Sequence, residues 1–161
     1  VCSSDLRDYN SSKFTVIGGT IKAYQKEAAY IIQRGLEGTN IYYSSLEEAA
    51  MMKYTINCFL ATKVSFMNEI YRICEESGID YERIHRLVKL DQRMGNSHMY
   101  VPGPDGQFGY GGMCFPKDMS ALLNMNKIPK PILETIIKQN DLIRGENAWP
   151  IQRNYTFHSP K

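Results

Sequence analysis

The sequence contains one stretch of helix-forming residues that is unusually long for a chain of 161 residues. It opens with a capping box, Ser45-Leu46-Glu47-Glu48, in which the serine caps the helix start and Glu48 reaches back to it. No proline or glycine follows until Gly78. The pattern predicts a helix of about thirty residues, roughly 45–50 Å long, which is longer than an ordinary globular helix.

The apolar side chains of this stretch cover more than one side of the predicted helix. They are Met52, Ile56, Phe59, Leu60, Val64, Phe66, Met67, Ile70, Ile73 and Cys74. A helix that is apolar on several sides must be covered on several sides, and a chain of this length has few other helices to cover it. A second copy of the same helix is the natural partner, so the sequence predicts a homodimer through this helix.

The residues before the long helix have the pattern of a small α/β unit. Two short β-branched and aromatic runs, 13–19 and 40–43, flank an amphipathic segment. We therefore expect residues 1–44 to form a β-α-β unit, residues 45–145 a helical domain and residues 146–161 an irregular tail. The predicted fold class is mainly α, with one long helix preceded by this short unit.

Three shorter helices are predicted downstream, over residues 81–90, 116–125 and 132–144. Asp80 is a suitable cap for the first of them. Pro116 suits the first position of the second, because its missing N–H would have no partner there.

The composition is that of an ordinary globular protein. Hydrophobic residues make up 43% of the chain, charged residues 22%, and the net charge is +2, so nothing indicates a nucleic-acid or membrane partner. The four cysteines match no disulfide framework or metal-binding spacing, which predicts a reducing, cytoplasmic setting. The three histidines are scattered, so we expect no metal site.

Residues 108–118 (FGYGGMCFPKD) combine the features of a nucleophile's setting. The glycines allow the backbone to turn tightly and to lie close against a ligand. Cys114 is predicted at a helix N-terminus, where the helix dipole and Lys117 both favour a thiolate. Asp118, four residues on, is close enough to act on a water or a proton near that sulfur. A purely structural cysteine in a glycine-rich turn is the alternative.

Other polar residues and one loop are further candidates for a site. Lys53 and Asn57 are four residues apart and share one face of the long helix, although two solvated side chains would look the same. From the sequence pattern by itself, Arg93 is predicted to be a surface cation at a helix end. Residues 99–112 are rich in Gly and Pro and too polar for the core. They predict a long loop whose backbone N–H groups can bind a phosphate or sugar.

Several of these motifs resemble those of the UDP-glucose/GDP-mannose dehydrogenase family. Residues 111–118 (GGMCFPKD) are similar to that family's catalytic-cysteine motif, and residues 91–98 and 101–106 (DQRMGNSH and VPGPDG) are similar to the block upstream of it. The spacing of Lys53 and Asn57 resembles the family's central helix. The resemblance implies the family's helical central domain, which forms the dimer, preceded by the end of its Rossmann-type NAD-binding domain.

The resemblance also implies a reaction. A UDP-sugar such as UDP-glucose is oxidised at C6 to a carboxylate, here UDP-glucuronate, through a cysteine thioester with two NAD⁺ and one water. Cys114 would be the nucleophile, and Lys53 and Asn57 would stabilise the oxyanion. Asp118 through a water, or neutral Lys53, would take the hydroxyl proton, and Asp118 would activate the water of the last step. Lys117, with Cys114, would approach the NAD. The substrate-binding residues would be Arg93, acting across the dimer interface, and Tyr100, Val101, Pro102, Gly103, Phe108, Gly109, Tyr110, Gly111 and Gly112.

The chain departs from the family in what surrounds these residues. No GxGxxG motif follows a strand, so the dinucleotide fingerprint is missing. Residues 1–6 read VCSSDL where relatives have Glu-Phe-Leu. We expect both flanking nucleotide-binding domains to be missing and the chain to be inactive alone. A non-enzymatic helical dimer or binding module derived from such an enzyme is the alternative.

Overall fold

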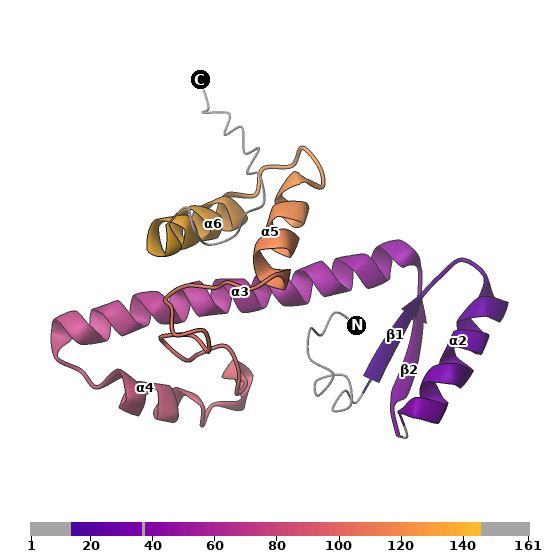
Figure 1. Cartoon of the computed structure of the whole chain (residues 1–161), viewed down its shortest axis with the longest axis horizontal. Helices are drawn as coiled ribbons and strands as arrows, with labels where there is room; N and C mark the ends of the chain where they lie inside the picture. The colour runs from indigo at the N-terminus through magenta and orange to yellow at the C-terminus, as the bar shows by residue number, and fades with distance from the viewer. Residues whose placement is uncertain (1–13, 37, 146–161) are drawn as a thin grey trace.

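The computed structural model describes residues 14–36 and 38–145, and one long helix organises them (Figure 1). Two strands and a helix lie at the N-terminal end of this helix, one short helix lies beside its other end, and two helices pack over its middle. In chain order the elements are β1 (Phe14–Gly18), α2 (Lys22–Gly35), β2 (Asn40–Ser44), α3 (Leu46–Ser77), α4 (Tyr81–Val88), η1 (Gln92–Met94), α5 (Cys114–Asn124) and α6 (Pro131–Arg144). The predicted fold class is confirmed.

The long helix α3 begins and ends where the sequence signals place its termini. The amide N–H of Glu48 donates to Ser45 Oγ at 3.1 Å, and the amide N–H of Ser45 donates to Glu48 Oε2 at 2.8 Å. Gly78 ends the helix with a φ of 66°, a left-handed conformation that favours glycine. The helix has 32 residues, so the predicted length is confirmed.

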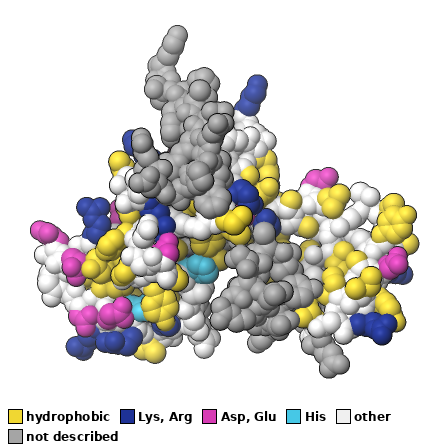
Figure 2. All heavy atoms as spheres, viewed as in Figure 1, with side chains coloured by type: hydrophobic (Ala, Val, Ile, Leu, Met, Phe, Trp, Pro, Cys, Tyr) yellow, Lys and Arg dark blue, Asp and Glu magenta, His cyan; other side chains and the backbone are white. Residues whose placement is uncertain are grey.

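The β-α-β unit precedes α3 and contains two parallel strands, with Phe14 opposite Asn40. Gln25 of α2 ties the unit together, because its side-chain amide lies 2.9–3.2 Å from the carbonyls of Ile17, Gly19 and Ser44. Figure 2 shows hydrophobic side chains on the surface of this part of the molecule, at the right. The exposed hydrophobic residues of this unit include Tyr24, Tyr30, Ile31, Tyr42 and Tyr43.

Two small cores lie along α3. The first joins α3 to α5 and α6 and contains Cys58, Ala61, Tyr110, Met119 and Ile137. The second joins α3 to α4 and the following loop and contains Met67, Cys74, Tyr81, Met99 and Val101. The expectation that residues 99–112 are too polar for the core is therefore wrong, because three apolar side chains of this loop are buried among helix residues.

Four boundaries of the shorter helices differ from the prediction by one or two residues: the end of α4, both ends of α5 and the start of α6. The second of the shorter helices, α5, begins at Cys114 and not at residue 116. Pro116 is its third residue, where the missing N–H still leaves no intrahelical bond unmade. α4 ends at Val88, two residues before the predicted end. The predicted tail, 146–161, lies outside the described residues. In the part of the chain that the structure describes, no helix is both long and apolar enough to cross a bilayer.

Candidate functional site

The carboxylate of Asp118 is the centre of a polar cluster between α3 and α5. Its side chain is fully buried. The side-chain amide of Asn57 donates to Asp118 Oδ2 at 2.6 Å, and Lys53 Nζ lies 3.6 Å from the same oxygen. Lys117 Nζ pairs with the other carboxylate oxygen. Since the i,i+4 spacing puts Lys53 and Asn57 on one face of α3, one carboxylate receives both side chains.

The groups around Asp118 decide its ionisation. Burial alone would raise the pKa of this carboxyl group, but two sets of neighbours oppose it: hydrogen bonds from Lys117 and Asn57, and the positive charges of Lys53 and Lys117. Together they hold the pKa of Asp118 below its ordinary value. Asp118 is therefore ionised at neutral pH. Among the described residues, no group of three His, Cys, Asp or Glu side chains is placed to hold a metal ion.

Cys114 is the first residue of α5 and lies one turn before Asp118, so the two side chains share a face of that helix. Its thiol forms no disulfide and its surface is partly exposed. Cys58, next to Asn57 on α3, has a different setting. Burial, followed by the negative charge of Asp118, raises the pKa of the Cys58 thiol to about 11. Of these two cysteines, only Cys114 combines access with a helix N-terminus.

The loop residues predicted to bind substrate fall into two groups. The side chains of Val101 and Tyr110 pack into the two cores and are only 6% and 4% exposed, so only their backbone can face a ligand. Six other residues of this set have exposed or partly exposed surfaces: Tyr100, Pro102, Gly103, Phe108, Gly111 and Gly112. Gly109 is buried. Their role in binding remains a prediction.

Arg93 does not join the Asp118 cluster. Its guanidinium pairs with Asp91 at 2.5–3.1 Å, and its side chain is 89% exposed. The turn that follows it is held from α3, because Lys63 Nζ donates to the carbonyls of Met94 and Ser97 at 2.6 Å each. Burial lowers the pKa of Lys63. Arg93 is thus carried by an anchored turn and points into solvent.

The structure also reveals polar residues that sequence reasoning did not assign to the site. Asn68, Asn140 and Arg144 bond to the backbone of the loop at Gly109 and Tyr110. These contacts join residues that are 41, 30 and 35 positions apart. No local pattern could have revealed them, because each depends on how α3 and α6 pack around the loop.

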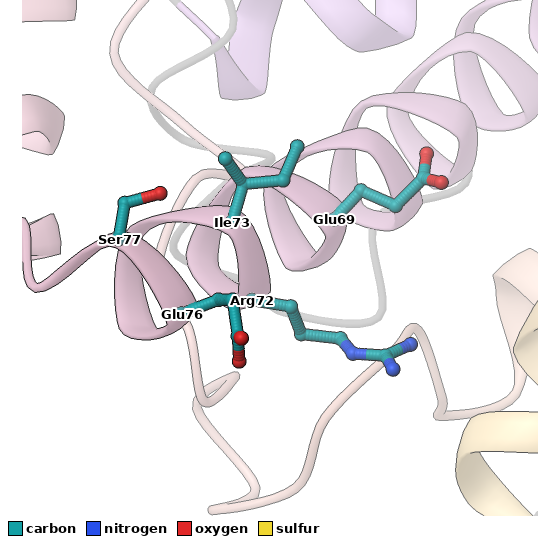
Figure 3. A pocket seen from close by; sticks show the side chains of 5 residues that line it. All are labelled: Glu69, Arg72, Ile73, Glu76 and Ser77. Carbon is teal, nitrogen blue, oxygen red and sulfur yellow. The ribbon is translucent and has the colours of Figure 1, made fainter.

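A surface hollow farther along α3 is separate from this site. Figure 3 shows its lining residues on α3, with Ile73 and Glu69 on one side of the helix and Arg72 extending along it. Glu76 and Ser77 complete the lining. Since Glu69 follows Asn57 by twelve residues, the hollow begins about 18 Å along the axis from the Asp118 cluster. It contains none of the predicted site residues.

The motif and the cluster agree with comparisons to known proteins. The model of the UDP-glucose/GDP-mannose dehydrogenase family, central domain, matches residues 47–142. The chain belongs to this family. The match includes Lys53, Asn57, Cys114 and Asp118, so the suspected family is confirmed.

Individual relatives give the same family and show how much of it this chain covers. UDP-glucose 6-dehydrogenase TuaD of Bacillus subtilis is 36% identical over 86% of this chain and 29% of its own length. GDP-mannose 6-dehydrogenase of Azotobacter vinelandii is 34% identical over 86% of this chain and 31% of its own. The solved structure of a UDP-glucose dehydrogenase from Pyrobaculum islandicum superposes with a TM-score of 0.71 at 26% identity, covering 85% of this chain and 31% of that one. The chain thus spans less than a third of each of these relatives.

Proposed function

We propose that this chain carries the thiol site of a nucleotide-sugar 6-dehydrogenase, which oxidises a substrate of the UDP-glucose type to UDP-glucuronate. The observation that carries the proposal is the buried Asp118 carboxylate, which gathers Lys53 and Asn57 from α3 one turn away from Cys114. A nucleophile, two donors and a carboxylate from two different helices are the groups that acyl chemistry on a sulfur needs.

Cys114 would act on the C6 aldehyde of the nucleotide sugar. Its thiolate adds to the carbonyl carbon, and the carbonyl oxygen becomes the oxyanion of a thiohemiacetal. Lys53 and Asn57 supply a cation and an N–H donor from one helix face, as stabilisation of an oxyanion requires. Both are already oriented by Asp118, so little reorganisation is needed when the charge develops. The covalent bond to sulfur retains the aldehyde between the two oxidation steps.

Asp118 would serve the final step, hydrolysis of the thioester. A water adds to the thioester carbonyl and gives up its protons to solvent, the bond from carbon to sulfur breaks with its electron pair going to sulfur, and the carboxylate product leaves while Cys114 remains as thiolate. Because its pKa is held low, Asp118 is a weak base that stays ionised at neutral pH and can accept a hydrogen bond. Its main contribution is therefore to orient the water and the donors and to balance the two lysine charges.

The cofactor of the reaction would be NAD, which takes up a hydride in each oxidation. The described residues do not form the usual dinucleotide-binding turn, because the connection between β1 and α2 lacks its glycine pattern. We therefore assign no hydride step to this chain. Lys117, half exposed beside Cys114, is the residue we expect nearest to the NAD. A reducing, cytoplasmic setting would keep Cys114 as a free thiol.

The family site would also need a second copy of the chain. Phe59, Phe66 and Ile73 are spaced seven residues apart on α3 and are 67%, 51% and 58% exposed. They form one apolar line that the described part of this chain leaves uncovered, which supports a homodimer through α3. In such a dimer the exposed Arg93 would reach the partner's substrate. The same line supports the second candidate function, a helical dimer without catalysis.

Acylation of Cys114 by a simple activated ester tests the proposed chemistry without cofactor. With p-nitrophenyl acetate we expect a burst of one p-nitrophenolate per chain and an acetyl group on Cys114, found by peptide mass, with little on Cys58. Cys114→Ala should abolish the burst, and Asp118→Asn should slow release of the acetyl group roughly tenfold to a hundredfold. A wild-type chain without a burst, or a burst that survives in Cys114→Ala, would contradict the proposal and leave the dimer as the better candidate.

A further inference from the structure

The loop between η1 and α5 has no regular secondary structure, yet its backbone is held by side chains from two helices. The amide N–H of Gly109 donates to Asn68 Oδ1 of α3 at 2.9 Å, and that of Tyr110 donates to Asn140 Oδ1 of α6 at 2.8 Å. Arg144 Nη2, also on α6, donates to the Gly109 carbonyl at 3.0 Å. Buried backbone groups need such partners, so the loop depends on these side chains.

Side chains of α6 pack so closely against the loop that two of its glycines could not carry a side chain. Gly109 has a φ of +73°, and a Cβ added there would lie 2.5 Å from Asn140 Oδ1. A Cβ added to Gly111 would lie 2.1 Å from Arg144 Nη1. The sequence alone suggested that these glycines let a ligand approach the backbone. The contacts give a second reason for them, which is that two side chains of α6 occupy that space.

Arg144 fastens the tip of the loop as well as its base. Its side chain is 6% exposed, and Nη2 lies 2.8 Å from Asp105 Oδ2 in addition to the Gly109 carbonyl. Burial alone would raise the pKa of Asp105, but the Arg144 guanidinium and the backbone N–H groups of Gln107 and of Asp105 itself outweigh it and lower that pKa. One fixed cation therefore holds two points of the loop that are four residues apart.

The held segment leads directly to Cys114. Tyr110 is buried in the first core beside Met119 of α5, and its ring makes an edge-to-face contact with Phe115, with 6.3 Å between ring centroids. Phe115 is the residue after Cys114. If Tyr110 moves, the first turn of α5 moves with it, and Cys114 changes its position relative to Asp118.

We infer that Asn140 and Arg144 are positioning residues of the candidate site, which set the geometry of Cys114 from α6 through the loop backbone. The inference rests on the proposed function and extends it, because neither residue belongs to the group around Asp118. It predicts that Cys114 can stay reactive as a thiol while losing its alignment with Lys53 and Asn57 when the α6 contacts are removed.

Asn140→Leu tests the inference, with Gln139→Leu as control, since Gln139 directly precedes Asn140 in α6 and makes none of these contacts. We expect amide exchange in residues 103–112 to rise at least tenfold in Asn140→Leu. Acylation of Cys114 by p-nitrophenyl acetate, divided by its alkylation by iodoacetamide, should fall about tenfold. A change in the exposure of the thiol alone affects both reactions and leaves this ratio unchanged. Asn140→Asp keeps the acceptor for Tyr110 and should restore both values. If Asn140→Leu does not fold, Arg144→Leu, which removes the other α6 contact to the loop, takes its place.

The outcomes separate this inference from the proposed function. An Asn140→Leu chain that folds and keeps the wild-type ratio overturns the inference, as does an equal loss in Gln139→Leu. A wild-type chain that is not acylated at all overturns the proposed function and this inference with it. Arg144→Leu should lower the ratio in the same direction as Asn140→Leu, and an unchanged ratio there removes Arg144 from the proposal.

Discussion

At the scale of one residue, the members of the Asp118 cluster differ in how much of their charge is removed from solvent. The Asp118 side chain has no surface exposed to bulk solvent, and one amide and two ammonium groups lie against its carboxylate. Both lysines keep part of their surface in water, so the desolvation falls mainly on the carboxylate. Removing Asp118 should therefore disturb Asn57 and the geometry of the site more than it disturbs the lysines.

Asp118→Asn should destabilise the chain at neutral pH by about 1–3 kcal/mol, because charge-assisted hydrogen bonds are lost. The pKa of Asp118 is lowered in the folded state, so its contribution is present above the unfolded pKa of about 3.9 and is lost as pH falls through the lower folded value. Urea unfolding should therefore show a larger difference in the free energy of unfolding between wild type and variant at pH 7 than near pH 3. A difference that grows towards low pH would contradict the assignment.

The residues that sequence reasoning placed in the site differ in how they could be found. Cys114 with Asp118, and Lys53 with Asn57, are pairs at helical spacing, so the helix period alone puts each pair on one face. The contact between the two pairs is long-range: the resemblance implied only that they serve one site, whereas the structure places Asn57 and Lys53 against Asp118. The pairing of Lys117 with Asp118 was not foreseen, since adjacent residues on a helix do not usually face each other.

At the scale of elements, α3 does three things at once. One face carries Lys53 and Asn57, buried residues along its length form the two cores, and a third line remains exposed. The capping box and Gly78 made its bounds predictable from local signals. The loop after η1 was less predictable, because its burial comes from Tyr81, Asn140 and Arg144, which no pattern within the loop reveals.

Phe66→Glu should convert a dimer of this chain into monomer or aggregate, because it places a charge in the middle of the exposed apolar line of α3. Leu46→Glu is the matched control. Leu46 is also an exposed apolar residue of α3, but it lies about 140° around the helix from Phe59, in the first turn, where an acidic side chain is favourable. Light scattering at micromolar concentration should report a dimer for the wild type and the control. A monomeric wild type would remove the homodimer from the proposal.

At the scale of the whole molecule, the β-α-β unit and the helices differ in how well they are packed. Both cores lie along α3 downstream of Asn57, and neither includes a residue of β1, α2 or β2. A two-stranded sheet gains little stability by itself. The unit is held to α3 by close contact at Gly18, where an added Cβ would lie 2.9 Å from Ala49 Cβ. The proposed thiol site therefore takes its residues from α3 and α5 alone.

This arrangement predicts that the chain of 161 residues, given UDP-glucose and NAD⁺, produces no steady NADH. Hydride transfer needs the nicotinamide held within about 3–3.5 Å of C6, and such positioning supplies roughly 7–11 kcal/mol of the barrier. The roles proposed for Lys53, Asn57, Cys114 and Asp118 are steps at the sulfur, and they cannot replace the positioning of the nicotinamide. Absorbance at the NADH band, with calorimetry for each ligand, measures the outcome, and Cys114→Ala is the control. Steady NADH that disappears in Cys114→Ala would contradict the prediction and would require a cofactor seat within this chain. A burst with p-nitrophenyl acetate in the same preparation, without NADH, would mean that the sulfur chemistry is complete here and that hydride transfer needs residues beyond these helices.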